Sequence, residues 1–253
     1  MDGVLHLSGV PVPQAAEAVA RLRAAGHRLR FVTNNTTRSQ RMLAGDLNAI
    51  GFDLAEDEVQ TTPIAVGRLL EGKRVLALTM AAIHDDLTRH LTLVDEDAEV
   101  VLLGGCDETD ENERVFTYET LSRAFHEIRA GARFVCLHRN RWWQTGRGLL
   151  LDSGAFVAGL EYTTGVQAEV VGKPSRAFFE VALAALEARP EEATMVGDDV
   201  EADIGGAKAL GMRGILVRTG KFREDTLARA DPQPDAVLES IADLPAFLES
   251  NQR

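Results

Sequence analysis

Residues 195–203 read Met-Val-Gly-Asp-Asp-Val-Glu-Ala-Asp, and the interpretation of the whole chain starts from this stretch. An apolar run that ends at Val196 predicts a short buried strand, which stops at Gly197. A helical pattern follows over residues 204–210. Like charges at this density repel one another, so the acidic loop needs a partner that offsets them. The loop contains four acidic residues within six positions: Asp198, Asp199, Glu201 and Asp203.

Two interpretations of this acidic loop are open when it is taken alone. Asp is favourable at the start of a helix, so the loop predicts a solvated acidic helix cap. Carboxylates that follow a strand of an open α/β sheet also predict a site for a hard cation, because ligands bind beyond the carboxyl ends of such strands. The remaining residues must show whether partners for a cation exist.

Composition and charge exclude several classes of protein. The chain has 253 residues, 45% of them hydrophobic, enough for one large α/β domain or two smaller ones. It carries 27 Lys and Arg against 39 Asp and Glu, a formal charge of −12, so we expect no nucleic-acid partner and no membrane partner. Cys106 and Cys136 lie in or beside apolar runs and form no C-x-x-C pair. They predict buried, reduced thiols in a cytoplasmic protein.

Strand and helix patterns alternate along the chain, which predicts an α/β fold with a doubly wound parallel sheet. Helices are expected at 13–25, 39–50 and 176–187, and strands at 27–32, 133–137 and 214–217. The section 71–167 has its own alternation. We therefore expect a core domain formed by residues 1–70 and 168–253, with an inserted α/β cap domain at 71–167.

Four polar stretches fall at predicted strand ends or at the chain start. They are Asp2-Gly3, Thr33-Asn34-Asn35, Lys173-Pro174 and the acidic loop 198–203. Strand ends at one edge of an open sheet converge on one crevice, so a carboxylate, a hydroxyl, an ammonium and an acidic cluster are expected together. This set suits phosphoryl transfer assisted by Mg²⁺. Each stretch alone also fits a plainer description, such as a polar turn or a frayed terminus.

The order of four motifs adds a family resemblance. Met-Asp-Gly-Val-Leu begins at residue 1, Phe-Val-Thr-Asn-Asn-Thr at 31, Val-Gly-Lys-Pro at 171 and Val-Gly-Asp-Asp-Val-Glu-Ala-Asp at 196. In this order the chain resembles the haloacid dehalogenase (HAD) superfamily, class IIA, over nearly its whole length. The resemblance implies a Rossmann-like core with an α/β cap, and a cytoplasmic phosphatase that uses Mg²⁺ on a small phosphorylated substrate.

The resemblance also implies roles for individual residues. Asp2 matches the second acid of the family's D-x-D motif, which protonates the leaving group, activates water and binds Mg²⁺ through its carbonyl. Thr33, with the backbone of Asn34 and with Asn35, would bind the substrate phosphoryl group. Lys173 would neutralise charge at the reacting centre. Asp198 would bind the metal directly, and Asp203 would support it.

The chain departs from the family at the position of the nucleophile. The first acid of D-x-D forms an aspartyl-phosphate in the family, and its position lies before Met1. The apolar strand that leads into it, central in the core sheet, is missing as well. A parallel sheet without its central strand should contain a void and unpaired backbone groups. We therefore expect Met1 to be a wrongly chosen start, and the chain as written to show at most residual hydrolysis.

A second function of another class is a catalytically dead HAD-like binding or scaffolding protein. The cap contributes a further stretch, residues 138–143, which follows a predicted strand. His138, Arg139 or Arg141 would meet an anionic substrate, and Trp142 or Trp143 would stack on a ring. The plainer explanation is a surface loop with both Trp residues packed in the cap core or in a homodimer interface. Relatives of this class commonly form homodimers through the cap, and the substrate is not specified by the sequence.

Overall fold

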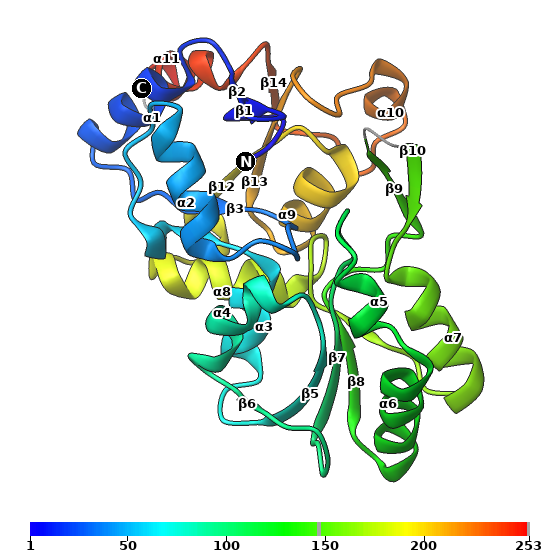
Figure 1. Cartoon of the computed structure of the whole chain (residues 1–253). Helices are drawn as coiled ribbons and strands as arrows, with labels where there is room; N and C mark the ends of the chain where they lie inside the picture. Colours follow the sequence, from blue (N-terminus) through cyan, green and yellow to red (C-terminus); the bar gives the residue numbers. More distant parts are fainter. Residues whose placement is uncertain (146–147, 252–253) are drawn as a thin grey trace. The chain divides into compact units, whose positions relative to one another are not determined.

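The computed structural model describes residues 1–145 and 148–251, which form two compact units. The first unit contains Met1–Thr33, Arg41–Gln60 and Lys173–Arg253, and the second contains Asn34–Gln40 and Thr61–Gly172. Both units are α/β, with helices and strands alternating along the chain (Figure 1). The expected fold class is confirmed, whereas the domain boundaries drawn from the sequence stay a prediction.

The first unit contains two parallel sheets that are not joined to each other. One has the order β12 (Thr194–Gly197), β13 (Arg213–Val217), β14 (Ala236–Leu238), and the other pairs β3 (Phe31–Val32) with β4 (Val59–Gln60). No strand among the described residues lies between β3 and β12. The start of the chain instead forms a small antiparallel hairpin, β1 (His6–Leu7) with β2 (Val10–Pro11).

The strand β3 is shorter than the strand expected from the sequence. A strand was expected over residues 27–32, but only Phe31–Val32 pairs regularly, with β4 on one side. The other edge faces the position between β3 and β12, where no strand supplies ladder hydrogen bonds. Residues 27–30 therefore run without a regular strand partner on that side.

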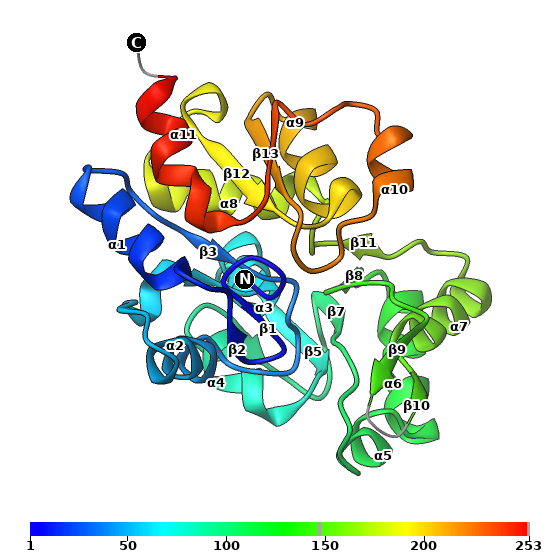
Figure 2. The same ribbon diagram turned by 90° about the horizontal axis from the view of Figure 1, so that it is seen from above.

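Helices of the first unit cover two apolar layers. α1 (Ala15–Ala24) has Ala18, Val19 and Leu22 on its buried face, the spacing of an amphipathic helix. Together with α11 (Leu244–Ser250), which lies beside it in Figure 2, α1 covers one layer. The helix α8 (Arg176–Leu186) contributes Phe179 and Leu183 to the other layer. The remaining α-helices of this unit are α2 (Gln40–Ala49), whose first residue is assigned to the second unit, α9 (Gly206–Ala209) and α10 (Glu224–Ala228).

The second unit is built on a five-stranded parallel sheet. Its order is β11 (Glu169–Val170), β8 (Arg133–Cys136), β7 (Val100–Leu103), β5 (Arg74–Leu78), β6 (Thr92–Leu93). β9 (Trp142–Thr145) and β10 (Gly148–Leu151) form a separate antiparallel hairpin. Its helices are α3 (Thr62–Leu69), α4 (His84–Thr88), α5 (Asn112–Val115), α6 (Tyr118–Ala130) and α7 (Gly154–Thr164).

Both cysteines belong to the second unit and are buried, as expected. Cys106 and Cys136 form no disulfide. Burial raises the pKa of each thiol to about 12, so neither is a thiolate near neutral pH. In the described part of the chain, no helix has the length and apolar composition needed to cross a bilayer.

The core of the second unit depends on Phe134, which is 1% exposed and packs between the sheet and its helices. We expect Phe134→Ala to lower the free energy of unfolding by about 3–5 kcal/mol, because it leaves a cavity in a closed apolar cluster. Tyr118→Ala, at a side chain that is 89% exposed in the same unit, is the control and should change it by less than about 0.5 kcal/mol. Urea denaturation of both variants measures the difference, and equal effects would contradict this packing.

Candidate active site at the carboxyl end of β12

The amino group of Met1 marks the point where the polar motifs of the first unit meet. It donates a hydrogen bond to the carbonyl oxygen of Val32, at 3.4 Å, at the end of β3. Burial lowers the pKa of this amino group to about 6. Four further charges act on the same amino group: those of Lys173, Asp203, Asp198 and Asp2. Charges from three separate stretches of sequence therefore lie within electrostatic range of one point.

Lys173 and Asp203 form a buried ion pair. The Nζ–Oδ1 distance is 2.6 Å, and the two side chains are 9% and 4% exposed. The second carboxylate oxygen of Asp203 accepts the backbone N–H of Asp199 at 3.3 Å. Asp203 also lies against the last residue of β12, because a Cβ on Gly197 would come within 2.3 Å of its Cβ. The pair is therefore fixed to the carboxyl end of β12.

Asp198 is a second buried carboxylate at the same strand end. Burial raises its pKa, and the neighbouring charge of Asp203 raises it further, whereas the N–H of Lys221, at 2.8 Å from Oδ2, lowers it. Gly3 approaches this carboxylate so closely that a Cβ there would lie 2.0 Å from Oδ2. Gly3 also has a φ of +82°, which favours glycine. The Asp2-Gly3 turn and the acidic loop are therefore in direct contact.

The loop after β13 also belongs to the site, and the sequence analysis missed it. The Thr219 hydroxyl donates to the carbonyl oxygen of Gly3, and Gly220 approaches both Gly3 and Asp198. Lys221 pairs through Nζ with Asp199, at 3.2 Å. The signal that would have found this loop is the strand-end rule already applied elsewhere, since Arg218-Thr-Gly-Lys221 directly follows an apolar strand.

Asp2 is near the site, but its carboxylate is engaged at the surface. Oδ1 accepts the N–H of Ser8 at 2.9 Å and lies 3.3 Å from Nδ1 of His6, and the side chain is 68% exposed. The hydrogen bond to His6 is the main reason that the pKa of Asp2 is lowered to about 2. The Ser8 amide also lowers this pKa, whereas burial, a smaller effect than the His6 hydrogen bond, raises it. In this conformation Asp2 is an ionised acceptor rather than a proton donor.

The Thr-Asn-Asn stretch is divided between the two units. Thr33 belongs to the first unit, where its N–H donates to the Gln60 carbonyl oxygen at 3.0 Å. Asn35 belongs to the second unit, and its Oδ1 accepts the N–H groups of Thr37 and Arg38, at 3.1 and 2.8 Å. Asn34 lies in the second unit as well, beside Gly172. The Asn35 side chain therefore shapes its own loop.

The donor atoms at the end of β12 fit a hard cation that keeps part of its water shell. In the described residues, no three His, Cys, Asp or Glu side chains converge as a complete metal-ligand set. Mg²⁺ does not require such a set, since it is commonly held by one or two carboxylates together with water and substrate phosphate. Burial raises the pKa of Asp198 because it disfavours the ionised carboxylate, and a bound cation would offset that cost.

Most of the cap stretch 138–143 is exposed, in line with its plainer explanation as a surface loop, but its first residue is buried. His138 is buried, with Nε2 3.1 Å from the Thr36 hydroxyl, and burial lowers its pKa. Arg139 donates to the buried carboxylate of Glu161 at 2.6 Å. Trp142 and Trp143 lie on β9, and Trp142 is 57% exposed. Hydrogen bonding within the second unit thus holds the start of this stretch, and a hairpin holds its end.

The first unit combines a parallel α/β architecture with a lysine–carboxylate pair and a further buried carboxylate at one strand end. These features are typical of α/β enzymes that act on anionic groups. The comparisons with known proteins specify the class. A profile described as haloacid dehalogenase-like hydrolase matches residues 1–92, and one described as HAD-hydrolase-like matches residues 170–244. The chain belongs to the haloacid dehalogenase-like hydrolase family.

Similar proteins extend over nearly the whole chain. Haloacid dehalogenase-like hydrolase domain-containing protein 2 of Homo sapiens is 39% identical over 243 residues, 95% of this chain and 90% of that protein. Phospholysine phosphohistidine inorganic pyrophosphate phosphatase of Xenopus laevis is 35% identical and covers 100% of this chain and 93% of that protein. The glycerol phosphate phosphatase of Mycobacterium tuberculosis, solved in complex with magnesium, has a TM-score of 0.83 and 29% identity, covering 96% and 74%.

The buried pair gives a prediction with an internal control. We expect Lys173→Met to lower the free energy of unfolding by about 3–5 kcal/mol, because it leaves the Asp203 carboxylate buried without its cation. Lys208 and Asp235 have the same 2.6 Å distance but are 20% and 34% exposed. Lys208→Met should therefore cost no more than about 1 kcal/mol. Equal losses in urea denaturation would show that burial is not what makes the Lys173 pair important.

Proposed function

We propose that this protein is a Mg²⁺-dependent phosphatase of small phosphorylated metabolites that works through an aspartyl-phosphate. The observation that carries the proposal is the Lys173–Asp203 pair beside the buried Asp198, at a strand end of a chain in a hydrolase family. Two relatives support the reaction class by their names, which describe phosphatases, and one of them was solved with magnesium.

In this proposal each residue acts on charge or on a proton. Asp198 would hold the metal, together with the backbone carbonyl of Asp2, and Asp203 would support Lys173 and the metal's surroundings. When bound, Mg²⁺ supplies electrostatic stabilisation of the phosphoryl oxygens. Lys173 adds a positive charge to the same centre. The Thr33 hydroxyl holds a phosphoryl oxygen, and the substrate-binding roles of Asn34 and Asn35 stay predictions.

Asp2 is the general acid and base of the proposal, and this role requires a change from the conformation described. Its carboxylate must leave His6 and Ser8, whose hydrogen bonds keep its pKa near 2. Released from them, the carboxyl group would hold a proton more readily. Asp2 would then protonate the leaving oxygen and later take a proton from water.

The nucleophile of the proposed reaction is not found among the carboxylates of this edge. Lys173 engages Asp203, the Lys221 amide engages Asp198, and Asp199 accepts the N–H groups of Glu201 and Ala202. In the proposal the attacking carboxylate would stand at the carboxyl end of a strand between β3 and β12, a position that no described strand occupies. The 253-residue chain alone should therefore show only residual hydrolysis.

One observation favours a second candidate, a binding or scaffolding protein without catalysis. The carboxylates at this strand end are engaged by protein donors, which is a stable arrangement without any reacting group. Such a protein would bind Mg²⁺ or phosphate without releasing product. Measuring phosphate release separates the two candidates.

A chain extended at its amino end by a short Val- and Leu-rich strand that ends in Asp directly before Met1 tests the nucleophile. Phosphate release is measured with Mg²⁺ on a panel of aryl, glycerol and amino-acid phosphates. The Asp extension should exceed both the 253-residue chain and a matched Asn extension by about 10³-fold or more, because removing a nucleophile usually abolishes nearly all of the rate. Equal rates for the Asp and Asn extensions would favour the binding protein.

Metal binding can be tested without activity. Saturating Mg²⁺ at about 100 times its dissociation constant should stabilise the 253-residue chain by about 2.7 kcal/mol at neutral pH. Asp198→Asn should remove this stabilisation, whereas Asp199→Asn, at a residue that bonds its own loop and Lys221, should retain it. Thermal unfolding with and without Mg²⁺ measures both. Retained stabilisation in Asp198→Asn would rule out the proposed ligand.

A further inference from the structure

One cation beside the acidic loop is not used in the proposed reaction. Lys221 belongs to the loop that follows β13, and its Nζ pairs with Oδ2 of Asp199, at 3.2 Å. Its backbone N–H donates to Oδ2 of Asp198, at 2.8 Å. The same residue therefore contacts two neighbouring carboxylates, one with its backbone and the other with its side chain.

The two preceding residues fix the backbone of this loop. The Thr219 hydroxyl donates to the carbonyl oxygen of Gly3, and Gly220 has a φ of +62°, which favours glycine. A Cβ on Gly220 would lie 2.2 Å from Oδ2 of Asp198, so the loop backbone packs directly on that carboxylate. The place of Lys221 beside the acidic loop is therefore set by backbone contacts and does not depend on its own ammonium.

The side chain of Lys221 is held much less firmly than its backbone. It is 75% exposed, and its partner Asp199 is 26% exposed. Exposed ion pairs contribute little stability, and lysine has a long flexible stem. The ammonium can therefore exchange Asp199 for another anion at little cost. Lys173, by contrast, is 9% exposed and lies 2.6 Å from Asp203, which fixes its position.

The charges that act on this ammonium are those of the carboxylates proposed to surround a metal. Partial burial lowers the pKa of Lys221, but the charges of Asp199, Asp198 and Asp203 outweigh that effect and raise it. The ammonium thus acts as a counter-charge to this group of acids. A divalent cation held by Asp198 would replace that counter-charge and repel the ammonium.

We propose that Lys221 is a second cation of the phosphate site, which pairs with Asp199 while the carboxylates are without a metal and turns to the phosphate group of the substrate once they hold one. This rests on the proposed function, because it needs a metal and a phosphoryl group at the same strand end. Lysine binds phosphate as a point charge, so no planar geometry is required. Lys173 is then the fixed cation of the site, and Lys221 the exposed one.

The proposal requires effects of opposite sign on the two ligands. The Lys221 ammonium opposes the entry of a divalent cation, because like charges repel. It favours phosphate, because it can donate a charge-assisted hydrogen bond. Removing its charge should therefore strengthen Mg²⁺ binding and weaken phosphate binding, whereas loss of a residue that only supports the fold would weaken both.

Lys221→Met in the 253-residue chain tests these signs, since it removes the ammonium and retains the backbone N–H that bonds Asp198. Calorimetric titration with Mg²⁺ alone should give a dissociation constant about threefold to tenfold lower than that of the unmodified chain. Titration with inorganic phosphate at saturating Mg²⁺ should give a dissociation constant about tenfold higher or more. Neither measurement requires turnover.

Two further variants are the controls. Lys221→Arg retains the positive charge and should restore both dissociation constants. Lys208→Met changes the net charge by the same amount, at a lysine that pairs with Asp235, and should leave both constants unchanged. Circular dichroism confirms that each variant is folded.

The outcomes separate this proposal from the proposed function. Constants that Lys221→Met leaves unchanged, changes for one ligand only or worsens for both would overturn the role of Lys221 and leave the metal and phosphate site in place. Equal effects of Lys208→Met would assign the changes to net charge and overturn it as well. An unmodified chain that binds no Mg²⁺ or no phosphate would overturn both proposals together.

Discussion

Two carboxylates buried at one strand end repel each other, and the polar arrangement of the first unit follows from how that repulsion is offset. Lys173 neutralises Asp203 at 2.6 Å, whereas Asp198 is met by a backbone N–H from the loop after β13. The offset is incomplete, since burial and Asp203 still raise the pKa of Asp198. A group held in this state is suited to a divalent cation, because a bound positive charge lowers the cost of its ionisation.

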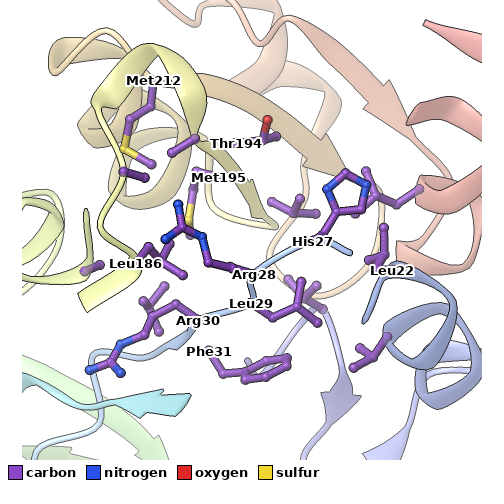
Figure 3. A pocket seen from close by; sticks show the side chains of 18 of the residues that line it. Leu22, His27, Arg28, Leu29, Arg30, Phe31, Leu186, Thr194, Met195 and Met212 are labelled. Atoms are coloured by element: carbon purple, nitrogen blue, oxygen red, sulfur yellow. The ribbon is translucent and has the colours of Figure 1, made fainter. Parts of the chain in front are cut away.

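The second constraint is hydrogen bonding in a parallel sheet, and it acts at the same place. Among the described residues, β3 and β12 each have a strand neighbour on one side only, and a mostly apolar cavity lies between them (Figure 3). The polar centre around Met1 lies at the carboxyl end of that cavity. Backbone pairing and site chemistry are thus linked, because β3 and β12 both end beside this polar centre.

The elements were predictable where a local pattern sufficed. The amphipathic spacing over 13–25 predicted α1, observed at Ala15–Ala24, and Ser175 begins α8 as an N-cap that accepts the Phe178 N–H. Strand ends were predictable as places for polar residues, which pointed to Lys173 and Asp198. The strand at 27–32 was overestimated, because strand length depends on a partner elsewhere in the chain.

The sequence by itself determined the α/β class, the family and the charged residues of the recognised motifs, because periodicity and motif order are local or linear properties. Tertiary structure alone decided how those charges are paired. Lys173 pairs with Asp203, and the Thr219–Lys221 loop closes on Gly3 and Asp198. The physical reason is that hydrogen bonds and burial between distant segments have no trace in the spacing of residues along the chain.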